Sequence, residues 1–102
     1  MALVLLLVTF PNDQSAKTMI AKVLEQKLAA CILRSNVNSS YLWESQQQDD
    51  QEVVTLLKTN QENIEQLEQY ISNNHPYEVP AIIRINASAN QDYETWLDKV
   101  IS

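Results

Sequence analysis

The side chains that bind transition metals are scarce in this chain. It contains one histidine, His75, and one cysteine, Cys31, among 102 residues. A tetrahedral zinc or copper site needs three or four ligands from histidine, cysteine and carboxylate side chains. A closed histidine–cysteine site within one chain is therefore excluded. An assembly could still form a site by pooling His75 from several copies or by pairing it with carboxylates. Alternatively, His75 has no ligand and is simply the first residue of a segment that Pro76 and Pro80 stiffen.

Lys58 stands where it could bind an anion. With Thr59 it comes just before the predicted start of a helix, where free N–H groups and the helix dipole favour negative charge. The anion could be a ligand phosphate or a carboxylate of a neighbouring subunit. The plainer interpretation is an inter-subunit ion pair with Glu78 or Glu44, and both remain open.

Four aromatic side chains could line a cleft between subunits, or could only pack at an interface, where Trp and Tyr dominate the energetics. They are Tyr41, Trp43, Tyr77 and Trp96. Four acids could attract hard cations weakly or could simply be solvated, namely Glu44, Asp49, Asp50 and Glu52. Cys31 begins a strand after an apolar helix, so we expect a buried structural cysteine.

The composition argues against several classes of function. The chain has no glycine, which removes the Gly-rich loops of kinases, P-loop proteins and dinucleotide-binding proteins. It has 13 acidic residues against 7 basic ones and no Lys/Arg cluster, so we expect no nucleic-acid partner. The chain has one histidine and no recognisable nucleophile beside it, which is too little for general acid–base catalysis. We therefore expect no enzyme.

We expect a cytoplasmic protein with no membrane partner. A single cysteine fits a reducing compartment. The apolar run Ala2 to Val8 lacks a basic lead-in and a cleavage site, so it does not resemble a targeting signal. No other segment approaches the roughly 18 apolar residues of a membrane span.

Hydrophobic periodicity and turn residues predict one domain over residues 1–102, with alternating strands and helices. Strands are predicted at Leu3–Val8 (covered on both faces), Ala30–Leu33 or to Ser35, Ser39–Glu44, Glu52–Lys58 and Ala81–Asn86. Asn36–Asn38 is predicted to interrupt the second strand, and Ser45–Gln51 to form a polar turn. Because glycine is absent, Asn is expected at left-handed backbone positions.

Three helices are predicted from apolar stripes and N-terminal caps. The first follows Asn12, the second follows the capping box Thr59–Glu62 and ends at Asn73–Asn74, and the third follows Asn90. Their stripes are Ala16, Met19, Ile20, Val23, Leu24 and Leu28, then Ile64, Leu67 and Ile71, then Tyr93, Trp96, Leu97, Val100 and Ile101.

This order of elements predicts an α+β ferredoxin-like sandwich, a split β-α-β fold with an extra C-terminal helix. The central hairpin is predicted to be much longer than the other strands. It would expose Tyr41, Leu42 and Trp43 beyond the helices unless another subunit covered them, so we expect an oligomer.

Three stretches resemble the CutA divalent-cation-tolerance family, and the resemblance covers nearly the whole chain. They are Leu28-Ala29-Ala30-Cys31 with Tyr41-Leu42-Trp43-Glu44, then Leu57-Lys58-Thr59, then His75-Pro76-Tyr77-Glu78-Val79-Pro80 with Tyr93 and Trp96-Leu97. The resemblance implies a PII-like homotrimer whose long hairpins run into neighbouring subunits. It also implies tolerance of copper and other divalent cations.

The chain departs from the pattern of this family at several positions. Val8 replaces a cysteine that is common in the first strand, and Ala81 replaces the glutamate that usually follows Pro80. Two side chains proposed as copper ligands in the family are therefore missing. Ser45 replaces the glycine that follows Trp43-Glu44.

The leading hypothesis is a trimeric cytoplasmic protein of divalent-metal tolerance or response that binds Cu²⁺ weakly, with His75 as the metal ligand. The first alternative is a PII-like sensor that holds a small anion in the inter-subunit cleft, and the second is a structural trimer without a ligand. The cleft residues are Lys58, Thr59, Tyr41, Trp43, Glu44, Tyr77 and Trp96, with Cys31 and Glu78 as accessories.

Overall fold

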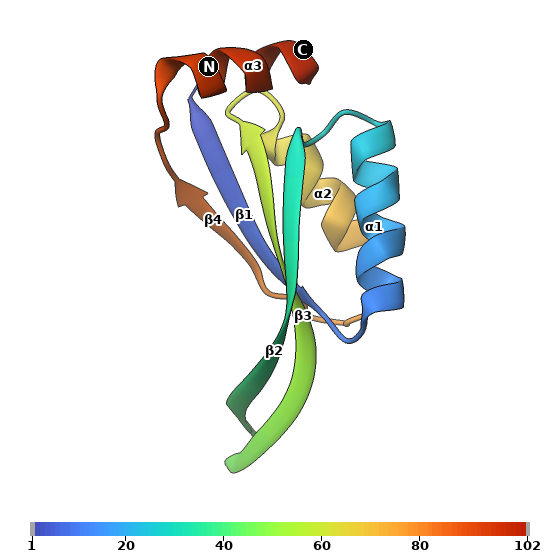
Figure 1. The fold of residues 1–102 in the computed structure, drawn as a ribbon. Coiled ribbons are helices and arrows are strands. Elements are labelled where there is room, and N and C mark those ends of the chain that lie inside the picture. Colours follow the sequence, from blue (N-terminus) through green and yellow to red (C-terminus); the bar gives the residue numbers. More distant parts are fainter. Residues whose placement is uncertain (1, 102) are drawn as a thin grey trace.

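The computed structural model describes residues 2–101, and four strands and three helices follow the predicted order. They are β1 (Leu3–Phe10), α1 (Asp13–Glu25), β2 (Cys31–Trp43), β3 (Gln46–Asn60), α2 (Ile64–Asn74), β4 (Ile82–Asn86) and α3 (Gln91–Val100). The strands form one antiparallel sheet in the order β2-β3-β1-β4. Helices α1 and α2 lie on one face of this sheet, and α3 crosses its end (Figure 1). The predicted ferredoxin-like sandwich with an extra C-terminal helix is confirmed.

The main core lies between the sheet and the helices α1 and α2. Side chains alternate between the two faces of a strand, and those of β1 that point to the helices are buried: Val4, Leu6, Val8 and Phe10. Asn12 caps α1 as predicted, since its Oδ1 accepts a hydrogen bond of 2.9 Å from the Ser15 N–H. Two predicted stripes are only partly buried, because Leu24 of α1 and Trp96 of α3 are 42% and 46% exposed.

The second face of the sheet carries apolar side chains that neither α1 nor α2 covers. The register places Leu33, Leu56, Leu7 and Ile83 in one row, and Cys31, Lys58, Leu5 and Ile85 in the next. We call these eight residues the open face. Leu33 and Ile83 are about half exposed, at 51% and 50%. The prediction that β1 is covered on both faces is therefore wrong within a single chain, since only α3 packs on the open face, at one end.

A two-stranded arm, residues 37–52, extends away from the rest of the sheet (Figure 1). Pairing of β1 with β3 stops at Phe10 and Val53, whereas β2 and β3 stay paired out to Trp43 and Gln46. The predicted long hairpin is confirmed. The predicted interruption at Asn36–Asn38 and the predicted turn at Ser45–Gln51 are wrong, because polar side chains are compatible with a ribbon exposed to solvent on both faces.

The arm closes with a two-residue turn in which neither residue is Asn or Gly. Glu44 and Ser45 have φ angles of 51° and 65°, as a tight hairpin turn requires. The third residue with positive φ is Lys27, so the expectation of Asn at such positions is wrong. Asn12 caps α1 with its side chain, whereas Asn90, predicted to cap the third helix, stands at the N-cap of α3 without a side-chain capping hydrogen bond.

The predicted capping box at Thr59–Glu62 is also wrong. Strand β3 continues to Asn60, and α2 begins only at Ile64. The buried Thr59 hydroxyl donates a 2.8 Å hydrogen bond to the carbonyl of Leu28 instead of capping a helix. The Asn60 side chain accepts from the Asn63 N–H, at 3.1 Å, and so closes the turn before α2.

Replacing Ser45→Gly should raise the free energy of unfolding by about 1 kcal/mol, because glycine adopts positive φ without the Cβ clash. Ser39→Gly, inside β2, is the matched control and should lower it by about 0.5–1 kcal/mol. Denaturant unfolding at fixed protein concentration measures both changes. Destabilisation by Ser45→Gly would contradict the turn geometry.

Candidate functional site

Lys58 is a half-buried cation in the open face. In the register it lies between Cys31 of β2 and Leu5 of β1. Its ammonium lies 5.3 Å from the centre of the Tyr93 ring, and that ring lies 5.5 Å from the ring of Trp96. Among the described residues no carboxylate lies within ion-pair distance of this ammonium. Among the described residues its charge is therefore stabilised by the Tyr93 ring and not by a carboxylate.

Thr59 and Cys31 do not lie as predicted. Thr59 points to the helices and is fully buried, so it is not available to a ligand on the open face. Because α2 starts at Ile64, Lys58 does not stand at a helix N-terminus, and the predicted anion site of that kind is wrong. Cys31 is a free cysteine that is half-buried on the open face and not fully buried as expected.

His75 is held by both ring nitrogens at the point where the arm leaves the sheet. Its Nε2 donates to the Thr9 carbonyl at 2.8 Å, and its Nδ1 accepts from the Tyr77 N–H at 3.0 Å. The ring also stacks on Phe10, with centroids 4.6 Å apart. Burial lowers the pKa of His75 below its usual 6.5, although the hydrogen bond to Thr9 and the charge of Glu52 act the other way.

Tyrosines tie the acids of the arm to neighbouring segments. The Tyr77 hydroxyl donates to Glu52 Oε2 at 2.7 Å, and burial together with this carboxylate raises the pKa of Tyr77. The Tyr41 hydroxyl donates to Asp50, whose carboxylate raises the pKa of Tyr41. These contacts use the acids as hydrogen-bond acceptors within the chain.

The described residues do not fit a metal ion within one chain. No group of three or more His, Cys, Asp or Glu side chains is placed to hold one among residues 2–101. A metal at His75 would have to displace one of its two hydrogen bonds. Val8 is buried on the face under the helices, and Ala81 is exposed.

The predicted cleft residues lie in two regions of one chain, the end of the sheet near α3 and the arm with its base. Lys58 and Trp96 lie at the end of the sheet near α3. Tyr77 lies at the base of the arm, beside His75. Tyr41, Trp43 and Glu44 lie at or near the tip of the arm, where Tyr41 and Trp43 are 40% and 64% exposed. Glu78 is exposed on the segment that follows α2.

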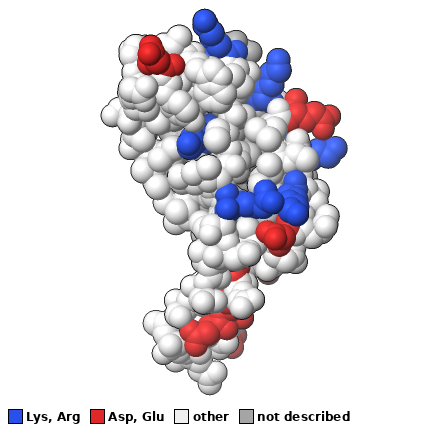
Figure 2. Space-filling view, viewed as in Figure 1, with Lys and Arg blue, Asp and Glu red and all other residues white. Residues whose placement is uncertain are grey.

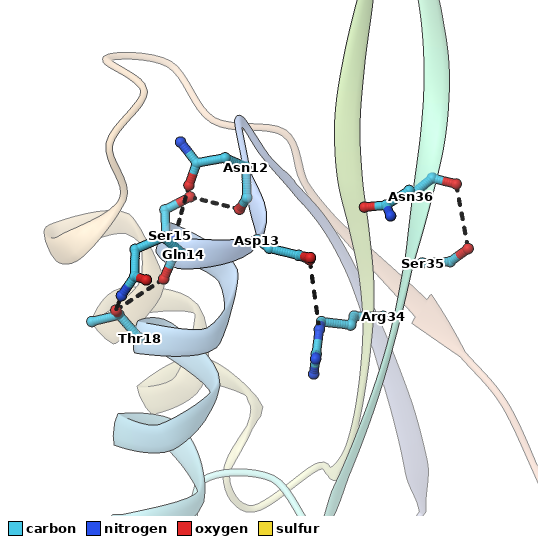
Figure 3. Close-up of polar contacts among 8 residues, drawn as sticks. All are labelled: Asn12, Asp13, Gln14, Ser15, Thr18, Arg34, Ser35 and Asn36. Carbon is cyan, nitrogen blue, oxygen red and sulfur yellow. Dashed lines mark hydrogen bonds and ion pairs between the residues drawn. The ribbon is translucent and has the colours of Figure 1, made fainter.

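A polar groove that the sequence did not predict lies between the start of α1 and the base of the arm. It has a volume of about 510 Å³, and its lining includes Asn12, Asp13, Asn36, Asn38 and Gln51. Asp13 faces Arg34 of β2 across 3.7 Å (Figure 3). Of the candidate residues Glu52 is part of its lining. The groove itself was missed because Asn36–Asn38 was expected to be a break in the strand.

The fold and the site define a class: a PII-like, ferredoxin-like sandwich with a projecting β-arm and no group of metal-binding side chains among residues 2–101. The family model of the CutA1 divalent ion tolerance protein matches residues 4–100. The chain therefore belongs to the CutA1 family.

Named relatives agree with this assignment. The divalent-cation tolerance protein CutA of Pyrococcus horikoshii is 38% identical over 96 residues, covering 93% of this chain and 94% of that protein. The chloroplastic protein CutA of Arabidopsis thaliana is 35% identical, covering 88% of this chain and 50% of that protein. The structure of CutA from Synechococcus elongatus superposes with a TM-score of 0.95 at 27% identity, covering 99% and 91% of the two chains.

The stability of the protein should depend on the protonation of His75. Its pKa is lowered on folding, so the unfolded chain binds a proton first as the pH falls. The free energy of unfolding should therefore be highest above about pH 6.5 and should fall as the pH drops toward the lower folded pKa. Melting temperatures between pH 7.5 and 5.5 measure this slope. His75→Gln should remove it, and an equal slope in both proteins would contradict the account.

Proposed function

We propose that the chain forms a cytoplasmic homotrimer that acts in divalent-cation tolerance or response. The main support for the trimer is exposed apolar surface. Leu33 and Ile83 of the open face are half exposed, and Leu42 of the arm is 77% exposed. Apolar surface of this extent usually marks an interface. The open face and the arm are different surfaces, so contact between them is head-to-tail, the kind of contact that forms a ring when its rotation closes. The link to divalent cations comes from the names of the relatives.

The location has its own support. Cys31 is free in the structure, which suits a reducing compartment. Among the described residues no helix is long and apolar enough to cross a membrane. A relative in Arabidopsis thaliana is named as chloroplastic, so the cytosol is proposed here for this chain alone.

In this proposal Cu²⁺ binds weakly and between subunits. His75 is the only imidazole, and its two hydrogen bonds compete with a metal. A site would need further ligands from another copy, because none assemble around it in one chain within residues 2–101. Weak binding of this kind suits a response to excess cation better than tight storage.

Lys58 supports a second candidate function, a sensor of a small anion. The supporting observation is that its half-buried ammonium has no carboxylate partner among the described residues. Tyr93 and Trp96 would form an aromatic wall beside the bound anion. A ligand-free structural trimer is the remaining alternative.

Titration with Cu²⁺ tests the leading proposal. Calorimetry should show weak saturable binding, and Cu²⁺ at ten times its Kd should stabilise the folded protein by about 1.4 kcal/mol. His75→Gln should abolish both effects, whereas Glu78→Gln, an exposed acid nearby in the sequence, should leave them unchanged. An unchanged Cu²⁺ response in His75→Gln would rule out this histidine as the ligand.

A further inference from the structure

Lys58 has an unbalanced charge that assembly would bury. Among the seven Lys and Arg side chains, all within the described residues, Lys58 alone is half-buried and the others are exposed. Its neighbours in the sheet are Cys31 and Leu5, and its one partner is the ring of Tyr93. If other copies cover the open face, this ammonium loses water, and a buried cation is costly unless an anion accompanies it.

The chain leaves few acids free to serve as that anion. Most carboxylates already have a partner in the chain, as Glu52 has in Tyr77 and Asp50 has in Tyr41. Glu65 and Asp92 lie in the first turns of α2 and α3, where the helix dipole stabilises them, and Glu62 lies two residues before the start of α2. Glu44 and Glu78 remain, with no hydrogen bond or ion pair among the described residues.

Glu44 is the better partner of these two acids. It closes the arm directly after Leu42 and Trp43, which are 77% and 64% exposed, so a surface that covers these side chains also reaches Glu44. Glu78 lies instead on a segment that is tied to its own chain through His75 and Tyr77.

The charge distribution agrees with this choice. The arm carries Glu44, Asp49, Asp50 and Glu52 and no Lys or Arg, so all seven cations lie on the rest of the molecule. In Figure 2 the arm shows acidic side chains and no basic ones, whereas the rest of the molecule shows both. The rest of the molecule also carries nine acids, so the attraction on the acidic arm comes from the local charge of Lys58 in the open face and not from the net charge of the neighbouring copy.

We propose that the arm of one copy lies against the open face of the next and pairs Glu44 with Lys58 of that neighbouring copy. The pair cannot form within one chain. Lys58 and the end of the arm at Gln46 are 12 strand positions apart, a separation of roughly 40 Å. Each copy would give one carboxylate and receive one, so the contact is head-to-tail, as a closed trimer ring requires. This inference rests on the trimer of the proposed function and adds the contact that joins its subunits.

Cross-linking between cysteines tests the contact directly. The variant Glu44→Cys with Lys58→Cys, in a Cys31→Ser background, should give a covalent trimer when treated with a short bis-maleimide. A bis-maleimide is used because the Cα atoms of an ion pair lie farther apart than a disulfide can span. Each single cysteine, and the pair Glu78→Cys with Lys58→Cys, should give far less. Equal or stronger cross-linking of the Glu78 pair would overturn the assignment.

Charge reversal tests the energy of the same contact. Glu44→Lys and Lys58→Glu should each weaken trimer association about tenfold or more, and the double variant should recover most of this loss. Glu78→Lys is the control and should have little effect.

Other outcomes separate this inference from the trimer itself. A stable wild-type trimer without coupling between the two positions would overturn the ion pair and leave the assembly intact. If inorganic phosphate then stabilises the trimer only when Lys58 is present, Lys58 binds a ligand anion instead. A monomeric wild-type protein would overturn both proposals.

Discussion

The structure depends on one constraint: two helices can cover only one face of its four-stranded sheet. Core packing of α1 and α2 buries Val4, Leu6, Val8 and Phe10 and leaves their alternate neighbours on the open face. Leu33, Ile83 and Ile85 stay 39–51% exposed there, and Lys58 lies in the same row as Ile85. The arm has the same deficiency, since a lone two-stranded ribbon is marginally stable in water. Both features are explained if copies of the chain cover one another.

Much of this arrangement could be predicted from the sequence. Apolar periodicity indicated the order of strands and helices, and Asn12 marked the start of α1. Errors arose where a local signal competed with pairing between strands. Polar Asn36–Asn38 looks like a break, yet continuous pairing with residues 51–53 holds it in β2. Thr59 begins a capping pattern, but its hydroxyl is used by Leu28. The pairing partners of these residues are distant in sequence, so no local pattern reveals them.

The candidate site was predicted less well than the fold. Lys58, His75 and the aromatic residues could be named as candidates from their residue types. That they lie far apart within one chain could not be predicted. The sequence also gave no sign that both nitrogens of His75 are engaged, because Thr9 is 66 residues away. A protein of this family with one imidazole, buried Val8 and exposed Ala81 has little capacity for metal within one subunit. In the proposed function Cu²⁺ therefore binds between subunits.

The central claim is that the open face is covered by other copies, and native mass by light scattering tests it most directly. At micromolar concentration we expect the wild type at three times the 11.7 kDa chain mass. Leu33→Asp, on the open face, should shift the mass toward one chain, whereas Leu24→Asp, at a similarly exposed position on α1, should not. A monomeric wild type, or a trimer indifferent to Leu33→Asp, would contradict the account.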